Sequence, residues 1–269
     1  MHDIQRVRVP VPDGLELDAA VHRPGPDVSA TGPGGTVLLV HGISADLDEG
    51  GTFVRLADHL TQAGMTAVRF SFRGHGRSGG SPQGVTIAGE MLDLQAVAAF
   101  AARRFPGPMA VVAASFGAVA TGLSMPWLGE RLARLVLWNP VLDLRRTFLE
   151  PELPWGLANF GPQPMADLAT SGQLLLGGRF PLGRVLFEEM AHYRPLDSYA
   201  AAAPPALVIH GDRDGCVSFD IARRAAETVP GWEFHAIPGA DHGLHSPAHE
   251  PEAIAVTVRW LRDGVGAQD

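Results

Sequence analysis

Short apolar runs alternate with segments of helical periodicity along most of the chain, and this alternation limits the possible folds more than any other feature. The runs expected to form strands are residues 36–42, 65–72, 109–115, 134–140, 206–212 and 232–239. Continuous apolar runs suit strands that are buried on both faces of a sheet. Strands that alternate with helices predict an α/β fold with a mostly parallel, doubly wound sheet.

Two parts of the chain depart from this rhythm. Residues 4–11 and 15–22 alternate apolar and polar side chains around Asp13-Gly14, which predicts an antiparallel hairpin at one edge of the sheet. Residues 143–200 are too long for a simple crossover and are rich in Pro, Gly, Trp and Phe. We expect a small inserted cap here, over the carboxyl ends of the strands, within a single domain spanning residues 1–269.

Distinctive polar residues follow the expected strands at their carboxyl ends. Ser115, Asp214 and His242 occur in this order along the chain, the order that serine hydrolases of the strand–turn–helix type use. A serine hydroxyl needs an imidazole to take its proton, and the imidazole needs a carboxylate to fix its tautomer. We therefore expect these three residues to be catalytic.

The serine lies in AVVAASFGAVATG, where Ala113 occupies the first glycine position of the G-x-S-x-G pattern. A sharp strand-to-helix turn strains the serine backbone and crowds the positions two residues away, so Ala113 and Gly117 have to be small. The backbone N–H groups of Phe116 and Ile43 are the expected oxyanion hole. Ala113 and the bulky Phe116 are also expected to shape the pocket, with Phe116 at its mouth.

Each catalytic assignment has competitors. Asp212 could replace Asp214, although we expect Asp212 to brace its loop. His245 and His249 compete with His242, and their spacing is reminiscent of a metal site. The sequence supplies no further ligands for a metal, so we expect none and place the two histidines near the solvated start of the last helix.

Other chemistry-bearing residues are interpreted as structural. His41 is expected to brace its loop, and Arg69, Arg73 and Arg77 to stabilise theirs. Cys216 is the single cysteine, which excludes an internal disulfide, and we expect it to be partly buried and inert. The glycines of RFSFRGHGRSGG open no helix at the position that dinucleotide binding requires, so no cofactor is expected.

Charge and composition exclude several kinds of partner. The net charge is −8, which argues against nucleic acid, and all 21 basic residues are arginine, so no lysine can form a Schiff base. The N-terminal stretch has no apolar signal region, and no run reaches the roughly 18 apolar residues of a membrane span. A cytoplasmic protein with no membrane association is expected; the oligomeric state is left open.

Several stretches together resemble one family. They are similar to the α/β-hydrolase superfamily, above all to small bacterial esterases that include feruloyl and cinnamoyl esterases. The stretches are the serine turn, HGISADLDEGGTFVRLADHLTQAGMTAVRFSFRGHGRSGG, WNPVLD, HGDRDGCV and GADHGL. The resemblance implies a serine esterase with Ser115, Asp214 and His242 as its triad, and Ile43 and Phe116 as oxyanion donors. GGRFPLGRVLFEEM resembles the inserted lid of those esterases, which shapes the acyl pocket. Many relatives have G-H-S-x-G where this chain has Ala-Ala-Ser-Phe-Gly.

The favoured function is hydrolysis of a small-molecule carboxylic ester or thioester through an acyl-Ser115 intermediate. An acyltransferase of a biosynthetic pathway, which would pass a carrier-bound or free acyl group to another acceptor, uses the same chemistry and is the alternative. A C–C bond hydrolase on the same triad and a non-catalytic ligand-binding protein are less favoured.

Overall fold

The computed structural model describes residues 3–25, 34–244 and 246–265. Its centre is an eight-stranded sheet with the strand order β1-β2-β4-β3-β5-β6-β9-β10. The strands are β1 (Asp3–Pro10), β2 (Glu16–Arg23), β3 (Thr36–Val40), β4 (Thr66–Phe70), β5 (Met109–Ala114), β6 (Leu132–Trp138), β9 (Ala206–Gly211) and β10 (Trp232–Ile237). β2 runs antiparallel to β1 and β4, and the other pairs are parallel. The predicted mostly parallel sheet with an antiparallel hairpin at its edge is confirmed.

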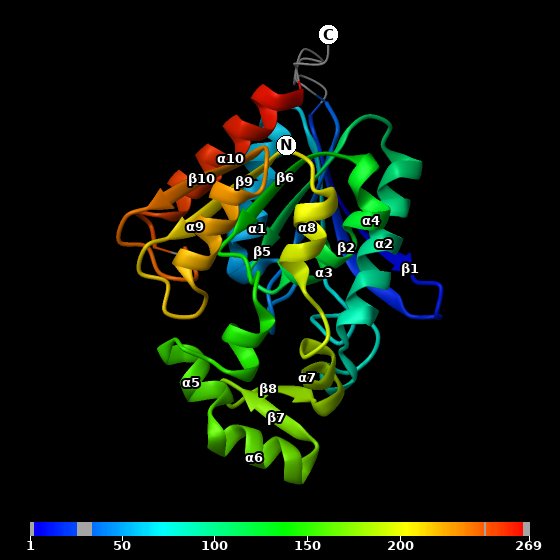
Figure 1. Ribbon diagram of the computed structural model, residues 1–269. Coiled ribbons are helices and arrows are strands. Elements are labelled where there is room, and N and C mark those ends of the chain that lie inside the picture. Colours follow the sequence, from blue (N-terminus) through cyan, green and yellow to red (C-terminus); the bar gives the residue numbers. More distant parts are fainter. Residues whose placement is uncertain (1–2, 26–33, 245, 266–269) are drawn as a thin grey trace.

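Helices cover both faces of the sheet (Figure 1). On one face lie α1 (Thr52–Gln62) and α10 (Glu250–Val265); on the other lie α2 (Ile87–Arg104), α3 (Gly117–Leu123), α4 (Met125–Leu128), α8 (Pro195–Ala202) and α9 (Phe219–Thr228). Short turns of 3-10 helix are η1 (Glu49–Gly51), η2 (Pro82–Gly84) and η3 (Gly129–Arg131), and η4 (Arg145–Leu149) is a π-helical turn. Each face has its own apolar core, because the central strands carry buried side chains on both sides.

The chain between β6 and β9 forms a separate layer at the carboxyl ends of the strands (Figure 1). We call residues 143–194 of this stretch the inserted segment. It contains α5 (Pro154–Phe160), α6 (Pro162–Ser171), β7 (Gln173–Leu176), β8 (Phe180–Gly183) and α7 (Arg184–Met190), and β7 pairs with β8 as a small antiparallel sheet. The following helix α8 belongs to the main body instead, since Tyr199 is fully buried in the sheet core and donates a hydrogen bond to the carbonyl of Ala118 at 2.7 Å.

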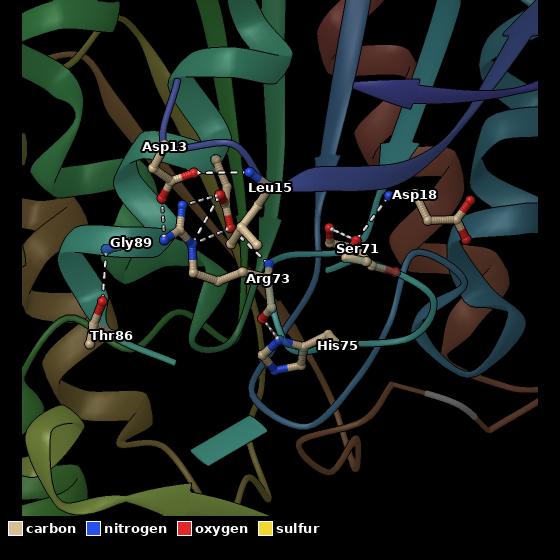
Figure 2. Close-up of polar contacts among 10 residues, drawn as sticks. Asp13, Leu15, Asp18, Ser71, Arg73, His75, Thr86 and Gly89 are labelled. Carbon is tan, nitrogen blue, oxygen red and sulfur yellow. Dashed lines mark hydrogen bonds and ion pairs between the residues drawn. The ribbon is translucent and has the colours of Figure 1, made fainter. Parts of the chain in front are cut away.

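The loop after β4 is tied to its neighbours by Arg73 (Figure 2). Its guanidinium contacts the buried carboxylate of Asp93 on α2 at 2.7 Å and that of Asp13 in the β1–β2 turn at 2.8 Å. Thr86 starts α2 by accepting a hydrogen bond from the backbone N–H of Gly89 at 3.0 Å. These contacts agree with the interpretation of Arg73 as a loop-stabilising residue.

Within the described residues, no helix combines the length and the hydrophobicity that a membrane span requires.

Candidate active site

Ser115 lies on the sharp turn between β5 and α3. Its φ angle is +50°, a left-handed conformation that is costly for a residue with a side chain. The next turn of chain passes so close to β3 that a Cβ atom at Gly117 would lie 2.5 Å from the carbonyl oxygen of His41 and 2.7 Å from that of Val40. Only glycine fits at this position, which is stricter than the small residue predicted from the sequence.

The loops after β5, β9 and β10 bring Ser115, Asp214 and His242 together. His242 Nε2 lies 2.9 Å from Ser115 Oγ, and His242 Nδ1 lies 2.7 Å from Asp214 Oδ2. The side chain of Asn139 holds the histidine loop in place: it donates to the carbonyl of His242 and accepts from the backbone N–H of Gly211 at 2.9 Å. The result is a continuous line of hydrogen-bonding groups from a carboxylate to a serine hydroxyl.

The carboxylate of Asp214 is buried and fully engaged. Oδ1 accepts from the backbone N–H groups of Cys216 at 2.7 Å and Val217 at 2.9 Å. Oδ2 contacts the buried imidazole of His210 at 3.1 Å in addition to His242. Burial by itself would raise the pKa of Asp214, but its contacts with the imidazoles of His210 and His242 hold it well below its usual value. Asp214 is therefore ionised throughout the physiological pH range.

The residues that competed with Asp214 and His242 for the catalytic roles are accounted for separately. Asp212 accepts a hydrogen bond from the backbone N–H of Gly239 at 2.7 Å, so it braces the loop as expected and leaves the imidazole to Asp214. His249 lies in the turn directly before α10, and His245 lies outside the described residues. His210 was not singled out from the sequence, because a histidine inside an apolar strand run gives no signal of its partner.

His41 holds the loop that follows β3. Its Nδ1 lies 2.8 Å from the carbonyl oxygen of Gly42, and its Nε2 accepts from the backbone N–H of Phe72 at 2.9 Å. Burial, together with the nearby His75, lowers the pKa of His41 to about 3, so the ring is neutral and its proton is on Nδ1. A Cβ atom at Gly42 would lie 3.1 Å from Ser115 Cβ, which places this loop directly against the serine.

Backbone strain is concentrated around the same place. Among the described residues, the non-glycine residues with positive φ are Ser44, Glu49, Ser115, Asn139 and Leu244. Glu49 begins η1, and the other four lie in the loops that follow the carboxyl ends of β3, β5, β6 and β10. Strained residues of this kind persist where the surrounding structure holds a side chain in a required position. Sequence reasoning identified the strain only at Ser115.

A cavity of about 420 Å³ opens at Ser115 and His242. One side is formed by the main body, which contributes Gly42, Ile43, Ser44, Glu49, Val141, Cys216 and Val217. The other side comes from residues 147–180, which contribute Thr147, Phe148, Trp155, Leu176, Gly177, Arg179 and Phe180. The lining combines aromatic and aliphatic side chains with polar groups in similar measure, and Glu49 and Arg179 are its acidic and basic residues.

The expectation that Ala113 and Phe116 shape the pocket is wrong. Ala113 is fully buried within the sheet, and Phe116 is 1% exposed. The ring of Phe116 packs edge-on against that of Phe148 at 5.5 Å, in an apolar cluster that also contains Val141, and Phe116 is not among the residues that line the cavity. The turn that exposes Ser115 directs its neighbour's side chain into the core, so the aromatic lining comes from Phe148, Trp155 and Phe180 instead.

Cys216 lies half-buried in the cavity wall. Burial and the neighbouring carboxylates of Asp214 and Asp241 raise the pKa of its thiol to about 12. Side-chain ligand atoms of Asp214, Cys216 and His242 lie within 4.8 Å of one another. A protonated thiol is a poor metal ligand and a poor nucleophile, which agrees with the interpretation of Cys216 as inert.

This sheet order, with helices on both faces and a strained serine turn after a central strand, defines an α/β-hydrolase. Residues 31–175 match the family model described as serine aminopeptidase, S33. The chain belongs to this family and is an enzyme of the α/β-hydrolase class.

Individual relatives are distant but similar over almost their whole length. A monoacylglycerol lipase from Mycolicibacterium smegmatis is 24% identical over 266 residues, which cover 86% of this chain and 89% of the lipase. The structure of Est1E from Butyrivibrio proteoclasticus with bound ferulic acid superposes with a TM-score of 0.80 at 18% identity, covering 97% of this chain and 99% of Est1E. The Pyrococcus furiosus esterase Pf2001 gives a TM-score of 0.71 at 19% identity, covering 98% and 94%. At these identities the solved structures establish the fold.

Proposed function

We propose that this protein hydrolyses a carboxylic ester or thioester of a small molecule through an acyl-Ser115 intermediate. The observation that carries the proposal is the line of hydrogen bonds from Ser115 Oγ through His242 to Asp214, at a cavity with aromatic side chains in its wall. A neutral imidazole 2.9 Å from a serine hydroxyl can accept its proton as the hydroxyl oxygen attacks a carbonyl carbon.

The reaction would proceed in two halves. In the first, the Ser115 Oγ–carbon bond forms, the carbonyl π electrons move to oxygen, and His242 takes the hydroxyl proton. Collapse of this intermediate breaks the bond to the alcohol or thiol, which leaves with the proton from His242. In the second half, water attacks the acyl group in the same way and releases the acid. Asp214 would hold the His242 proton on Nδ1 and stabilise the imidazolium.

The negative oxygen of each intermediate needs fixed donors. We assign this role to the backbone N–H groups of Ile43 and Phe116. Ile43 is in the cavity wall, in the loop that lies against Ser115, and Phe116 is the residue after the serine at the start of α3. The loss of one such donor costs roughly 2.7–4 kcal/mol of transition-state stabilisation in comparable enzymes.

The cavity favours an apolar or aromatic acyl group. Its volume of about 420 Å³ falls in the range typical of small-molecule sites, and Phe148, Trp155 and Phe180 supply aromatic surface. The similarity to a monoacylglycerol lipase supports an ester substrate, and that to a structure with bound ferulic acid supports an aromatic acyl group. We infer that the inserted segment acts as a cap on a single domain and selects the acyl group.

A fluorophosphonate probe and a panel of p-nitrophenyl esters test the proposal. Wild-type protein should turn over the esters and gain the mass of one probe on Ser115, and Ser115→Ala should lose both properties. Ser124→Ala, at the far end of α3, is the matched control and should keep both. Absence of turnover and of Ser115-dependent labelling would refute the proposal. The partition of a labelled acyl group between water and added alcohols, amines or thiols then distinguishes hydrolysis from acyl transfer.

A further inference from the structure

We propose that Glu49 is a positioning residue for the oxyanion loop, which we define as residues 41–44. It would hold the loop by accepting the backbone N–H of Gly42, and so aim the N–H of Ile43 at the reacting oxygen. This role rests on the proposed function, because it assumes that Ile43 donates to an oxyanion formed at Ser115.

The two peptide units on either side of Gly42 are each held by a side chain. Glu49 Oε2 accepts the N–H of Gly42 at 2.7 Å, and His41 Nδ1 donates to the carbonyl oxygen of Gly42 at 2.8 Å. The N–H of Ile43 belongs to the same planar, trans peptide unit as that carbonyl, so it points in the opposite direction. Fixing the N–H and the C=O of Gly42 therefore fixes the direction of the Ile43 N–H.

Gly42 makes such support necessary. A side chain here would crowd Ser115, because its Cβ would lie 3.1 Å from the serine Cβ and 3.5 Å from Oγ. Glycine avoids this clash because it has no side chain, but it has the widest range of backbone angles of any residue. The hydrogen bonds from Glu49 and His41 supply the restraint that the glycine lacks.

The backbone bends sharply to bring Glu49 to this position. Its φ angle is +45°, and Gly50 and Gly51 follow at +64° and +94°, so three successive residues are left-handed. Glu49 also lines the cavity together with Ser115 and His242. A non-glycine residue in this conformation is strained, and the contacts of the folded protein have to offset that strain.

No ion pair accounts for the position of Glu49. The described residues form no ion pair with it: the nearby Arg55 pairs with Glu250, and Arg69 pairs with Asp48. Burial raises the pKa of Glu49 to about 7, although the Gly42 N–H and the nearby His242 oppose this shift. A carboxyl group that is strained, short of a counter-ion and costly to ionise is better explained by the hydrogen bond that it accepts.

The test compares Glu49→Gln with Glu49→Met, two side chains of similar length that differ in the presence of an acceptor. Glu49→Gln should keep kcat on a p-nitrophenyl ester within about threefold of wild type. Glu49→Met should lower kcat about 10- to 100-fold with little change in KM. This loss is smaller than the 10²- to 10³-fold loss on removing an oxyanion donor, because the N–H of Ile43 is still present but less well aimed. Asp46→Ala serves as the control, because it removes a carboxylate just outside the oxyanion loop that accepts from the backbone N–H of Asp48 and not from Gly42.

A trifluoromethyl ketone gives a second readout that a purely structural role would not change. Its carbonyl carbon bonds to Ser115 Oγ, the carbonyl oxygen becomes an alkoxide, and His242 takes the hydroxyl proton, so its affinity reports the oxyanion hole. Its affinity should fall in Glu49→Met by the same factor as kcat/KM and stay near wild type in Glu49→Gln. If Glu49→Met does not fold, Glu49→Ala replaces it.

Three results would overturn the assignment of Glu49: a Glu49→Met variant as active as wild type, a Glu49→Gln variant as impaired as Glu49→Met, or an equal loss in Asp46→Ala. Wild-type protein that neither cleaves esters nor binds the ketone would instead overturn the proposed function. The two failures are therefore distinguishable.

Discussion

Replacing Asp214 by asparagine should trap His242 in the wrong tautomer. The backbone N–H groups of Cys216 and Val217 both donate to Oδ1, at 2.7 and 2.9 Å, and a backbone N–H cannot become an acceptor. In Asp214→Asn the amide oxygen therefore has to stay on that side. The NH2 group then faces His242 and His210, where the carboxylate oxygen was.

An NH2 group that donates to His242 Nδ1 moves the imidazole proton to Nε2. That nitrogen lies 2.9 Å from Ser115 Oγ and would then be a donor, so the serine hydroxyl would lose its base. The comparable change in a serine protease lowers kcat about 10⁴-fold. We expect a loss of about 10³- to 10⁴-fold, which is roughly 4–5.5 kcal/mol of transition-state stabilisation.

The assay is kcat for a p-nitrophenyl ester, with thermal unfolding measured in parallel to show that the variant is folded. Asp212→Asn is the matched control. Among the contacts described, the carboxylate of Asp212 accepts a hydrogen bond only from the backbone N–H of Gly239, at 2.7 Å, and it has no contact with His242. It should remain within about threefold of wild type. A folded Asp214→Asn within tenfold of wild type, or an equal loss in Asp212→Asn, would refute the tautomer argument.

Two further predictions concern stability. Gly117→Ala would place Cβ 2.5 Å from the His41 carbonyl oxygen and 2.7 Å from that of Val40, so the free energy of unfolding should fall by more than about 2 kcal/mol. Gly25→Ala is the control, because no atom lies within 4 Å of its added Cβ. Similar denaturation curves for the two variants would contradict this prediction. Burial lowers the pKa of His75 to about 4 from 6.5, so the unfolded chain binds a proton first as the pH falls, and stability is lost between about pH 6.5 and 4. The wild type should lose about 2 kcal/mol more than His75→Asn between pH 7 and pH 5 in urea unfolding, and parallel losses would show that His75 does not titrate in this way.

Much of the fold follows from local patterns. Residues 37–40 and 109–114 are apolar throughout because their strands are buried on both faces, and β3 and β5 are neighbours at the centre of the sheet. The alternation in 4–11 reflects the edge strand β1, most of whose residues are exposed. The alternation in 15–22 predicted β2 correctly, but residues 17–22 are buried on both faces because β4 pairs with the other edge of β2. Local patterning therefore located these elements within a few residues, although not the burial of β2.

The detailed arrangement of the candidate site depended on the tertiary structure. The sequence indicated that Ser115, Asp214 and His242 follow strand ends, which in a parallel sheet meet at one edge. It did not reveal that His210 shares the carboxylate of Asp214, nor that Glu49 turns back to accept the N–H of Gly42. Both contacts depend on where a loop directs one side chain, and the hydrophobic pattern carries no such information.

The sequence by itself determined the class of fold, the order of the candidate residues and the need for a small residue at position 117. Burial and backbone crowding act over a few neighbouring residues, so these properties are written in local spacing. The tertiary structure decided that Phe116 packs into the core and that Phe148, Trp155 and Phe180 line the cavity. The direction of a side chain in a strained turn depends on the packing of segments far apart in the chain, and that packing exists only in the folded protein.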